Sequence, residues 1–97
     1  MGRLPATTEV RSIVIDPKEP KRVYAATGRG VYRSDDAGQT WQPSGHGLPE
    51  GAIGALALDP RQPQRLYAAT PEGALYLSED GASSWRLQAG AEHGAGR

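Results

Sequence analysis

The chain has 97 residues, the length of one small domain. It carries 11 basic and 11 acidic side chains, so nothing in its charge favours a nucleic acid or a membrane surface as a partner. Cysteine is absent, which excludes disulfides and thiolate metal sites but leaves the cellular compartment open.

The chain begins MGRLPATTEV, a stretch without the apolar segment that a signal peptide needs. No later run approaches the roughly 20 apolar residues that span a bilayer as a helix. With 13 glycines and 8 prolines, the sequence instead predicts many turns and few long helices. We therefore expect no signal peptide in this chain and no membrane partner.

Four short β-rich segments follow, separated by turn residues. They read VRSIVID, RVYAAT, GVYRS and TWQPS, and none offers the ten or more good helix formers that a helical repeat needs. The first is apolar on both faces, as expected of an inner strand. Pro17 and Pro20 lie in the connection after it, where no ladder donor is lost. These patterns predict strands at 10–15, 22–27, 30–34 and 40–44.

The second half of the chain repeats the first. The segment IVIDPKEPKRVYAAT (13–27) aligns with LALDPRQPQRLYAAT (56–70), and beyond Gly30 and Gly73 the second copy gains one residue. A period in the low forties is typical of helical repeats or of four-stranded propeller blades. The short β-rich segments favour blades. The repeat therefore predicts four more strands, at 53–58, 65–70, 74–78 and 84–88.

One motif recurs between the third and fourth predicted strands of each copy. The first copy, RSDDAGQTW, has the pattern Ser-x-Asp-x-Gly-x-x-Trp. The second, LSEDGASSW, keeps the serine, the aspartate and the tryptophan, but Ala82 stands where glycine is expected and Gly81 precedes it. The residues of the two motifs are Ser34, Asp36, Gly38 and Trp41, then Ser78, Asp80 and Trp85.

This motif is the Asp-box, and the chain resembles the BNR/Asp-box repeat β-propellers. That group includes sialidases, sortilin-type receptors, xyloglucan-cleaving glycosidases and the photosystem II stability/assembly factor. The resemblance implies an all-β fold: two four-stranded antiparallel β-propeller blades, each with an Asp-box turn between its third and fourth strands. It divides a single propeller segment, 1–97, into blades at about 4–47 and 48–90 and a flexible tail at 91–97. It is also compatible with an extracytoplasmic parent protein.

The residue types in the motif have a structural explanation. An aspartate in a turn accepts backbone N–H bonds, a serine at its entry bonds its neighbours, and a glycine permits positive φ. The tryptophan ring then packs on the next strand or blade. If the fifth position needs positive φ, Ala82 costs about 1–2 kcal/mol there. Ala82→Gly would then raise the melting temperature, and Gly38→Ala would lower it.

Four loop residues are the candidates for ligand binding. His46 and His93 lie in glycine-flanked loops, and a zinc site would want about three converging protein ligands. Arg29 and Glu72 occupy the tips of the second hairpins and break the repeat, as loop residues that set specificity do. We predict no metal site, no cofactor and no catalytic residue in this chain.

The remaining acids do not form a complete catalytic constellation. A glycosidase needs two carboxylates about 5–10 Å apart across the sugar. Asp16 and Asp59 each precede a proline at a strand end, where turn capping explains them. We expect Asp35 and Glu79 to be solvated. Sialidases also gather arginines from blades around the whole ring, and two blades cannot supply those.

Two function hypotheses follow. In the first, the chain is a non-enzymatic propeller module, a binding or assembly scaffold for a protein or carbohydrate ligand. Because two blades leave two apolar faces open, it would be completed by self-association into a ring or by the remaining blades of a longer propeller. The alternative is a fragment of a sialidase-like or xyloglucanase-like glycoside hydrolase.

Overall fold

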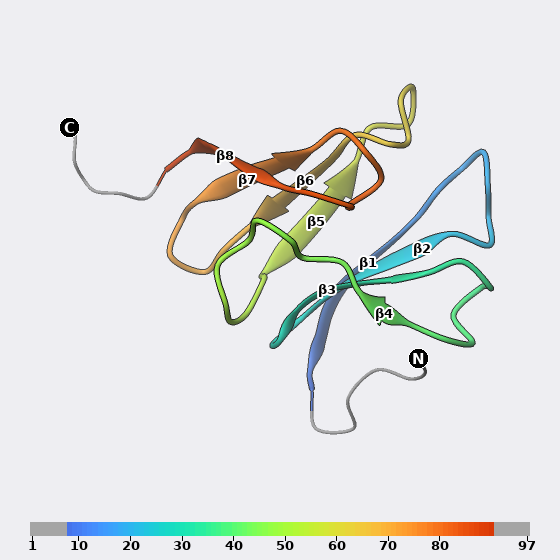
Figure 1. The fold of residues 1–97 in the computed structure, drawn as a ribbon, viewed down its shortest axis with the longest axis horizontal. Helices are drawn as coiled ribbons and strands as arrows, with labels where there is room; N and C mark the ends of the chain where they lie inside the picture. The colour runs from blue at the N-terminus through green and yellow to red at the C-terminus, as the bar shows by residue number, and fades with distance from the viewer. Residues whose placement is uncertain (1–7, 91–97) are drawn as a thin grey trace.

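The computed structural model describes residues 8–90, which form two antiparallel four-stranded sheets and contain no helix (Figure 1). All eight predicted strands are present, and the all-β prediction is confirmed. The first sheet comprises β1 (Val10–Ile15), β2 (Val23–Thr27), β3 (Gly30–Ser34) and β4 (Gln42–Pro43). The second sheet comprises β5 (Ala55–Leu58), β6 (Leu66–Ala69), β7 (Leu75–Ser78) and β8 (Arg86–Ala89). The predicted tail, 91–97, lies outside the described residues.

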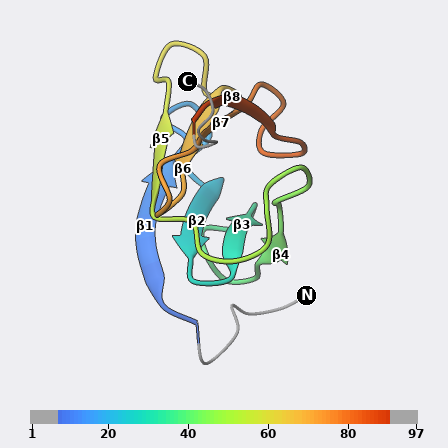
Figure 2. The same cartoon turned by 90° about the vertical axis from the view of Figure 1, so that its left-hand side faces the viewer.

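Each sheet is a simple meander in which every strand pairs with the next. The two sheets also share one register, since Val23 pairs with Ser34 in the first and Leu66 with Ser78 in the second. The sequence repeat is therefore a repeat of structure. Figure 2 shows β1 and β5 side by side, with the four strands of the first sheet running from β1 to β4 across the molecule.

The fourth strand of each sheet begins later than predicted, at Gln42 and at Arg86. The cause lies in the preceding turn. The backbone N–H groups of Thr40 and Ser84 donate to aspartate side chains in the turn, at 2.9 Å in both cases. An N–H group committed to the turn is not available for the sheet ladder, so strand pairing starts two residues on.

The two sheets pack against each other through one apolar cluster, which we call the sheet junction. Tyr24, on β2, and Leu66, on β6, are fully buried in it. Ile53, in the loop between the sheets, is also fully buried there, and its N–H donates to the Thr27 carbonyl at 3.0 Å. Since a buried aliphatic side chain contributes about 1.5–3 kcal/mol, this cluster is what holds the two sheets together.

The prediction that the first strand is apolar on both faces has a consequence in the structure. Val14 packs against the sheet junction, whereas Ile13 and Ile15 point the other way and are 54% and 55% exposed. One apolar face of the first sheet is thus covered by the second sheet, and on the other face Ile13 and Ile15 remain exposed.

Candidate functional site

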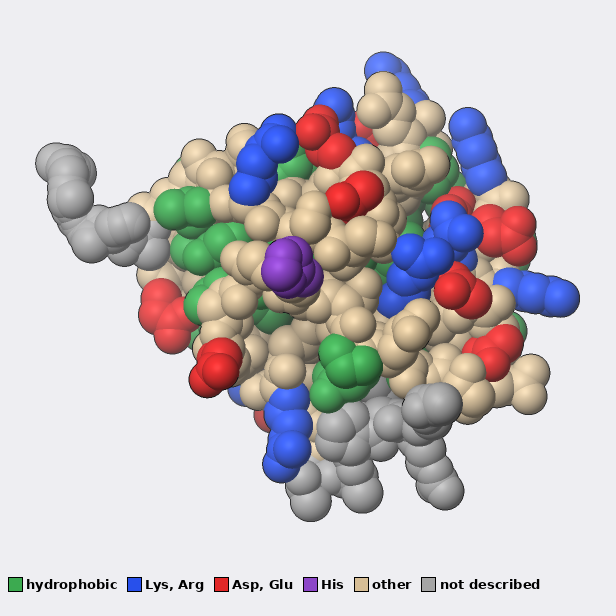
Figure 3. All heavy atoms as spheres, viewed as in Figure 1, with side chains coloured by type: hydrophobic (Ala, Val, Ile, Leu, Met, Phe, Trp, Pro, Cys, Tyr) green, Lys and Arg blue, Asp and Glu red, His purple; other side chains and the backbone are tan. Residues whose placement is uncertain are grey.

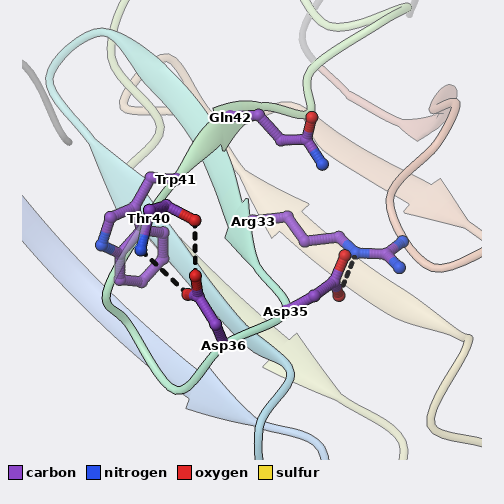
Figure 4. Close-up of a pocket in the computed structure, with 6 residues that line it drawn as sticks. All are labelled: Arg33, Asp35, Asp36, Thr40, Trp41 and Gln42. Carbon is purple, nitrogen blue, oxygen red and sulfur yellow. Dashed lines mark hydrogen bonds and ion pairs between the residues drawn. The ribbon is translucent and has the colours of Figure 1, made fainter. Parts of the chain in front are cut away.

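The turn between β3 and β4 is built around the Asp36 carboxylate (Figure 4). Thr40 donates to it twice, from its N–H at 2.9 Å and from its hydroxyl at 2.6 Å. The Ser34 hydroxyl donates to the same carboxylate at 2.7 Å, and its oxygen accepts the N–H of Gly38 at 2.8 Å. Serine and aspartate together therefore close the turn.

The turn between β7 and β8 repeats this arrangement bond for bond. Ser84 donates to Asp80 from its N–H at 2.9 Å and from its hydroxyl at 2.7 Å. The Ser78 hydroxyl donates to Asp80 at 2.9 Å and accepts from the N–H of Ala82 at 2.9 Å. Two sequences that differ at six of nine positions thus make the same hydrogen bonds.

These bonds lower the pKa of both aspartates. The Thr40 hydroxyl is the largest cause for Asp36, whose pKa falls from its ordinary value of 3.8 to about 2. The Ser84 hydroxyl is the largest cause for Asp80, whose pKa is also lowered. Donors that surround a carboxylate favour its charged form. At neutral pH both groups are carboxylate acceptors, with no proton to donate as a general acid.

Each turn places two consecutive residues at positive φ. They are Ala37 (64°) and Gly38 (93°) in the first turn, and Gly81 (70°) and Ala82 (70°) in the second. Packing explains why the order is alanine then glycine in the first turn but glycine then alanine in the second. A methyl group at position 81 would lie 3.2 Å from the guanidinium of Arg33, whereas the methyl group of Ala82 is fully buried in the sheet junction.

Sequence reasoning treated Asp35 and Glu79 as solvated, and the structure corrects this in part. Both are about half exposed, but each bridges two arginines. The Nε atoms of Arg22 and Arg33 lie 3.4 and 3.0 Å from Asp35. Arg65 and Arg86 make the matching bridges to Glu79. The acids before the turn aspartates therefore link strands within a sheet.

The two tryptophans differ in their partners. The indole N–H of Trp85 donates across the sheet junction to the Ser44 carbonyl at 2.9 Å, and the ring is 6% exposed. The indole N–H of Trp41 donates to Gly38 in its own turn, also at 2.9 Å, and the ring is only partly buried. The tryptophan therefore links the two sheets in the second copy, whereas in the first copy it closes its own turn.

Sequence reasoning missed residues that bond across the sheet junction, among them Arg33 and Ser44. Arg33 donates to the Gly81 carbonyl at 2.9 Å, and the Ser44 hydroxyl donates to the Ala82 carbonyl at 2.7 Å. The sequence signal that could have identified Arg33 is a difference between the two copies, because Leu77 occupies the corresponding position in the second copy. Both bonds hold the second turn against the first sheet.

Two of the four candidate ligand-binding residues come together. Arg29, at the β2–β3 turn, and His46, after β4, line one hollow of about 390 Å³. Tyr32, Pro43, Leu48 and Glu50 contribute to its walls. Glu72 lies apart, in the β6–β7 turn, and His93 lies outside the described residues.

The turn residues line smaller hollows. The one in Figure 4 has a volume of about 200 Å³, and its Asp36 and Asp35 carboxylates are already bonded to Thr40 and Arg33. Over residues 8–90 no group of three or more histidine and carboxylate side chains is placed to hold a metal ion. The same residues contain no helix suited to crossing a membrane. Acidic and basic side chains are interspersed on the face drawn in Figure 3.

Solved structures of other proteins resemble this fold. YCF48 from Cyanidioschyzon merolae matches with a TM-score of 0.70 and 17% identity, over 91% of this chain and 29% of that one. The GH74 xyloglucanase from Xanthomonas campestris matches with a TM-score of 0.66 and 24% identity, over 84% of this chain and 15% of that one. No protein-family model matches the chain, and a search of the curated proteins finds no match.

The chain therefore spans less than a third of either structural neighbour. Both neighbours are β-propeller proteins, and the likeness extends over most of the described sheets. At these identities it concerns the fold alone. The two meanders of this chain have the fold of β-propeller blades.

Proposed function

We propose that the chain is a non-enzymatic β-propeller module that acts as a scaffold for binding and assembly, with an Asp-box turn in each blade. The observation that carries this proposal is the use of the two turn carboxylates. Asp36 and Asp80 each accept three hydrogen bonds from their own turn, and the same set recurs in both copies. A residue that closes the same turn in each repeat has a structural role.

The hollow between Arg29 and His46 is the ligand site that this proposal favours. It offers a guanidinium, an imidazole, a carboxylate and the ring of Tyr32 around about 390 Å³. Pockets that bind small ligands have volumes of roughly 300–1,000 Å³ and place a few polar groups on apolar walls. This combination suits a carbohydrate or a short stretch of protein.

The second candidate function is that of a fragment of a glycoside hydrolase. The likeness to a xyloglucanase favours it, although 24% identity extends only to the fold. Hydrolysis requires two carboxylates about 5–10 Å apart across the sugar. In this chain Asp35 and Glu79, as well as the two turn aspartates, are bound to side chains of their own sheet.

A hydrolysis assay separates the two functions. The purified 97-residue chain is incubated with fluorogenic sialosides and with xyloglucan, and released fluorophore and reducing ends are measured. We expect no turnover above that of a denatured sample. Any turnover above that background would contradict the scaffold proposal.

A binding titration tests the hollow itself. Xyloglucan oligosaccharides are titrated into the chain and into a His46→Ala variant by calorimetry, with Glu72→Ala as the matched control. Since Glu72 is not among the residues lining the hollow, its loss is expected to leave binding unchanged, whereas His46→Ala weakens it. Equal binding by all three proteins would place the ligand elsewhere.

A further inference from the structure

Each sheet has one covered face and one open face. In an antiparallel pair, residues opposite each other point to the same side of the sheet. The register therefore assigns a set of side chains on the first sheet to the side away from the junction, the leading face: Ile13, Ile15, Val23, Ala25 and Tyr32. Within the single chain Val23 and Ala25 are already buried, so the exposed apolar surface of this face is that of Ile13 and Ile15. On the second sheet the corresponding outer side, the trailing face, comprises Ala55, Ala57, Tyr67, Ala69 and Leu75.

The leading face is a copy of a surface that is already buried inside the molecule. Ile13 and Ile15 correspond in the repeat to Leu56 and Leu58, which pack in the sheet junction. Ile13 is 54% exposed, whereas Leu56 is 8% exposed. The sequence thus provides the same apolar surface twice and covers it only once in a single chain.

The trailing face is likewise a copy of the other side of the junction. Tyr67 corresponds to Tyr24, which is fully buried in the junction, but Tyr67 itself is only half-buried. Ala57 corresponds to Val14, which packs against the junction, and Ala57 is exposed. None of the ten residues that define the two open faces is charged.

We propose that the leading face of one chain docks on the trailing face of a second copy of the same chain. The sheet junction is the template, because it already joins the counterparts of these two faces within one molecule. Contacts between two different faces are heterologous, so they add chains head to tail and close into a ring where the rotation fits. The inference deepens the proposed scaffold function by naming its partner, and rests on treating each sheet as a propeller blade.

Trp41 gives this contact a specific signature. Trp85 crosses the sheet junction to Ser44, whereas Trp41 bonds within its own turn. In the docked pair, Trp41 of one chain packs against the trailing face of its neighbour, as Trp85 packs against the first sheet within a single chain. The residue equivalent to Ser44 in the neighbour is Gln88, whose carbonyl becomes the indole acceptor. Docking therefore buries the ring of Trp41.

The test uses two variants that each block one face. The leading-face variant carries Ile13→Glu and Ile15→Glu, and the trailing-face variant carries Ala55→Glu and Ala57→Glu; all four positions are exposed in the single chain. Masses are measured by sedimentation over a range of concentrations, and far-UV circular dichroism checks folding. We expect the wild type to associate, each variant alone to stay monomeric, and a mixture of the two to stop at a dimer.

The outcomes distinguish the possible contacts. A wild type that stays monomeric at all concentrations overturns the proposal, and so does a blocked variant that still self-associates. Tryptophan emission gives an independent reading: it should shift to the blue as the wild type associates, but not in Trp41→Phe. Association without that shift would mean that another surface is used.

Failure of this proposal is separable from failure of the scaffold function. A monomeric chain that still binds xyloglucan oligosaccharides without cleaving them overturns the docking and leaves the scaffold proposal intact. A chain that assembles as described but hydrolyses its glycan confirms the docking and overturns the scaffold proposal.

Discussion

At the scale of single residues, the two turns contain the same chemistry in different sequences. Ser34 and Ser78 each accept an N–H from a residue at positive φ, and the aspartate two residues on accepts from the residue that precedes the tryptophan. What differs is the environment. Gly81 and Ala82 of the second turn are buried, whereas Ala37 and Gly38 of the first turn are exposed and half-buried.

The hydroxyl of Thr40 should control the titration of Asp36. Thr40→Val removes the largest cause of the lowered pKa, so we expect the Asp36 pKa to rise from about 2 towards 3.8. Ser84→Ala is the matched control, because it should move Asp80 and leave Asp36 unchanged. Carbon-detected NMR titration of the carboxyl groups measures both. If the Asp36 pKa stays where it is in Thr40→Val, the bond does not exist in solution.

The same bond makes stability depend on acid. Because the Asp36 pKa is lower in the folded than in the unfolded chain, its contribution is fully present above about pH 4 and is lost as pH falls through about 2. Urea unfolding of wild type and Thr40→Val across this window should give a steeper decline for the wild type. Parallel declines would show that Asp36 takes no part.

The alanines at positive φ are expected to respond differently to glycine. At Ala37, which is exposed, glycine removes about 1–2 kcal/mol of strain but costs about 0.5–1 kcal/mol of chain entropy, so the melting temperature rises slightly. At Ala82 a buried methyl worth about 0.8 kcal/mol is also lost, so the rise in melting temperature that the sequence predicts for Ala82→Gly is no longer expected. Gly38→Ala should lower the melting temperature. A clear rise in Ala82→Gly would contradict this assignment.

At the scale of elements, the loop between β4 and β5 is part of the core. The Trp85 N–H donates to the His46 carbonyl at 2.8 Å, and the side chain of Ile53 fills the sheet junction. The loop therefore does more than connect two sheets, because it accepts a backbone hydrogen bond from Trp85, donates one to Thr27 from Ile53, and adds apolar volume to the sheet junction.

Two glycines of this loop give a matched test. Gly47 (φ 97°) and Gly51 (φ 110°) both need positive φ, but a methyl group at 47 would overlap the Trp85 carbonyl, while at 51 it would meet nothing within 4 Å. Alanine at either position costs about 1–3 kcal/mol of backbone strain. We expect Gly47→Ala to lower the free energy of unfolding well beyond Gly51→Ala in urea titrations. Equal losses would mean that the contact with Trp85 is relaxed in solution.

At the scale of the whole molecule, the two sheets form one cooperative unit, because the sheet junction draws side chains from both. Ile53→Ala should lower the free energy of unfolding by about 2–5 kcal/mol, since the side chain is fully buried. Ile15→Ala, at 55% exposure, is the control and should change it by about 0.5 kcal/mol or less in dilute protein. Circular dichroism and tryptophan fluorescence should give coincident transitions; separate transitions would show independent sheets.

Much of this fold was predictable from the sequence because strand and turn patterns are local and occur twice. All eight strands overlap the ranges that the alternation and the turn residues predict, although β4, β5 and β8 begin two residues later. What could not be predicted is which copy of a repeated residue is buried: Tyr24 and Tyr67 have nearly the same neighbours in sequence, yet only Tyr24 lies in the junction. The hydrogen bond from Arg33 to Gly81, and the placement of Arg29 and His46 around one hollow, also depend on tertiary packing that the sequence pattern does not show.

The polar bonds of the sheet junction have a thermal consequence for assembly. Ser12, Arg33 and Ser44 each bond across the junction, and the second sheet has Ala55, Leu77 and Gln88 in their places. The proposed docking between chains would therefore rely mainly on apolar burial, which weakens on cooling and responds little to added sodium chloride. If chains dock as proposed, cooling would separate them while the fold of each chain persists, so temperature alone would control the proposed assembly.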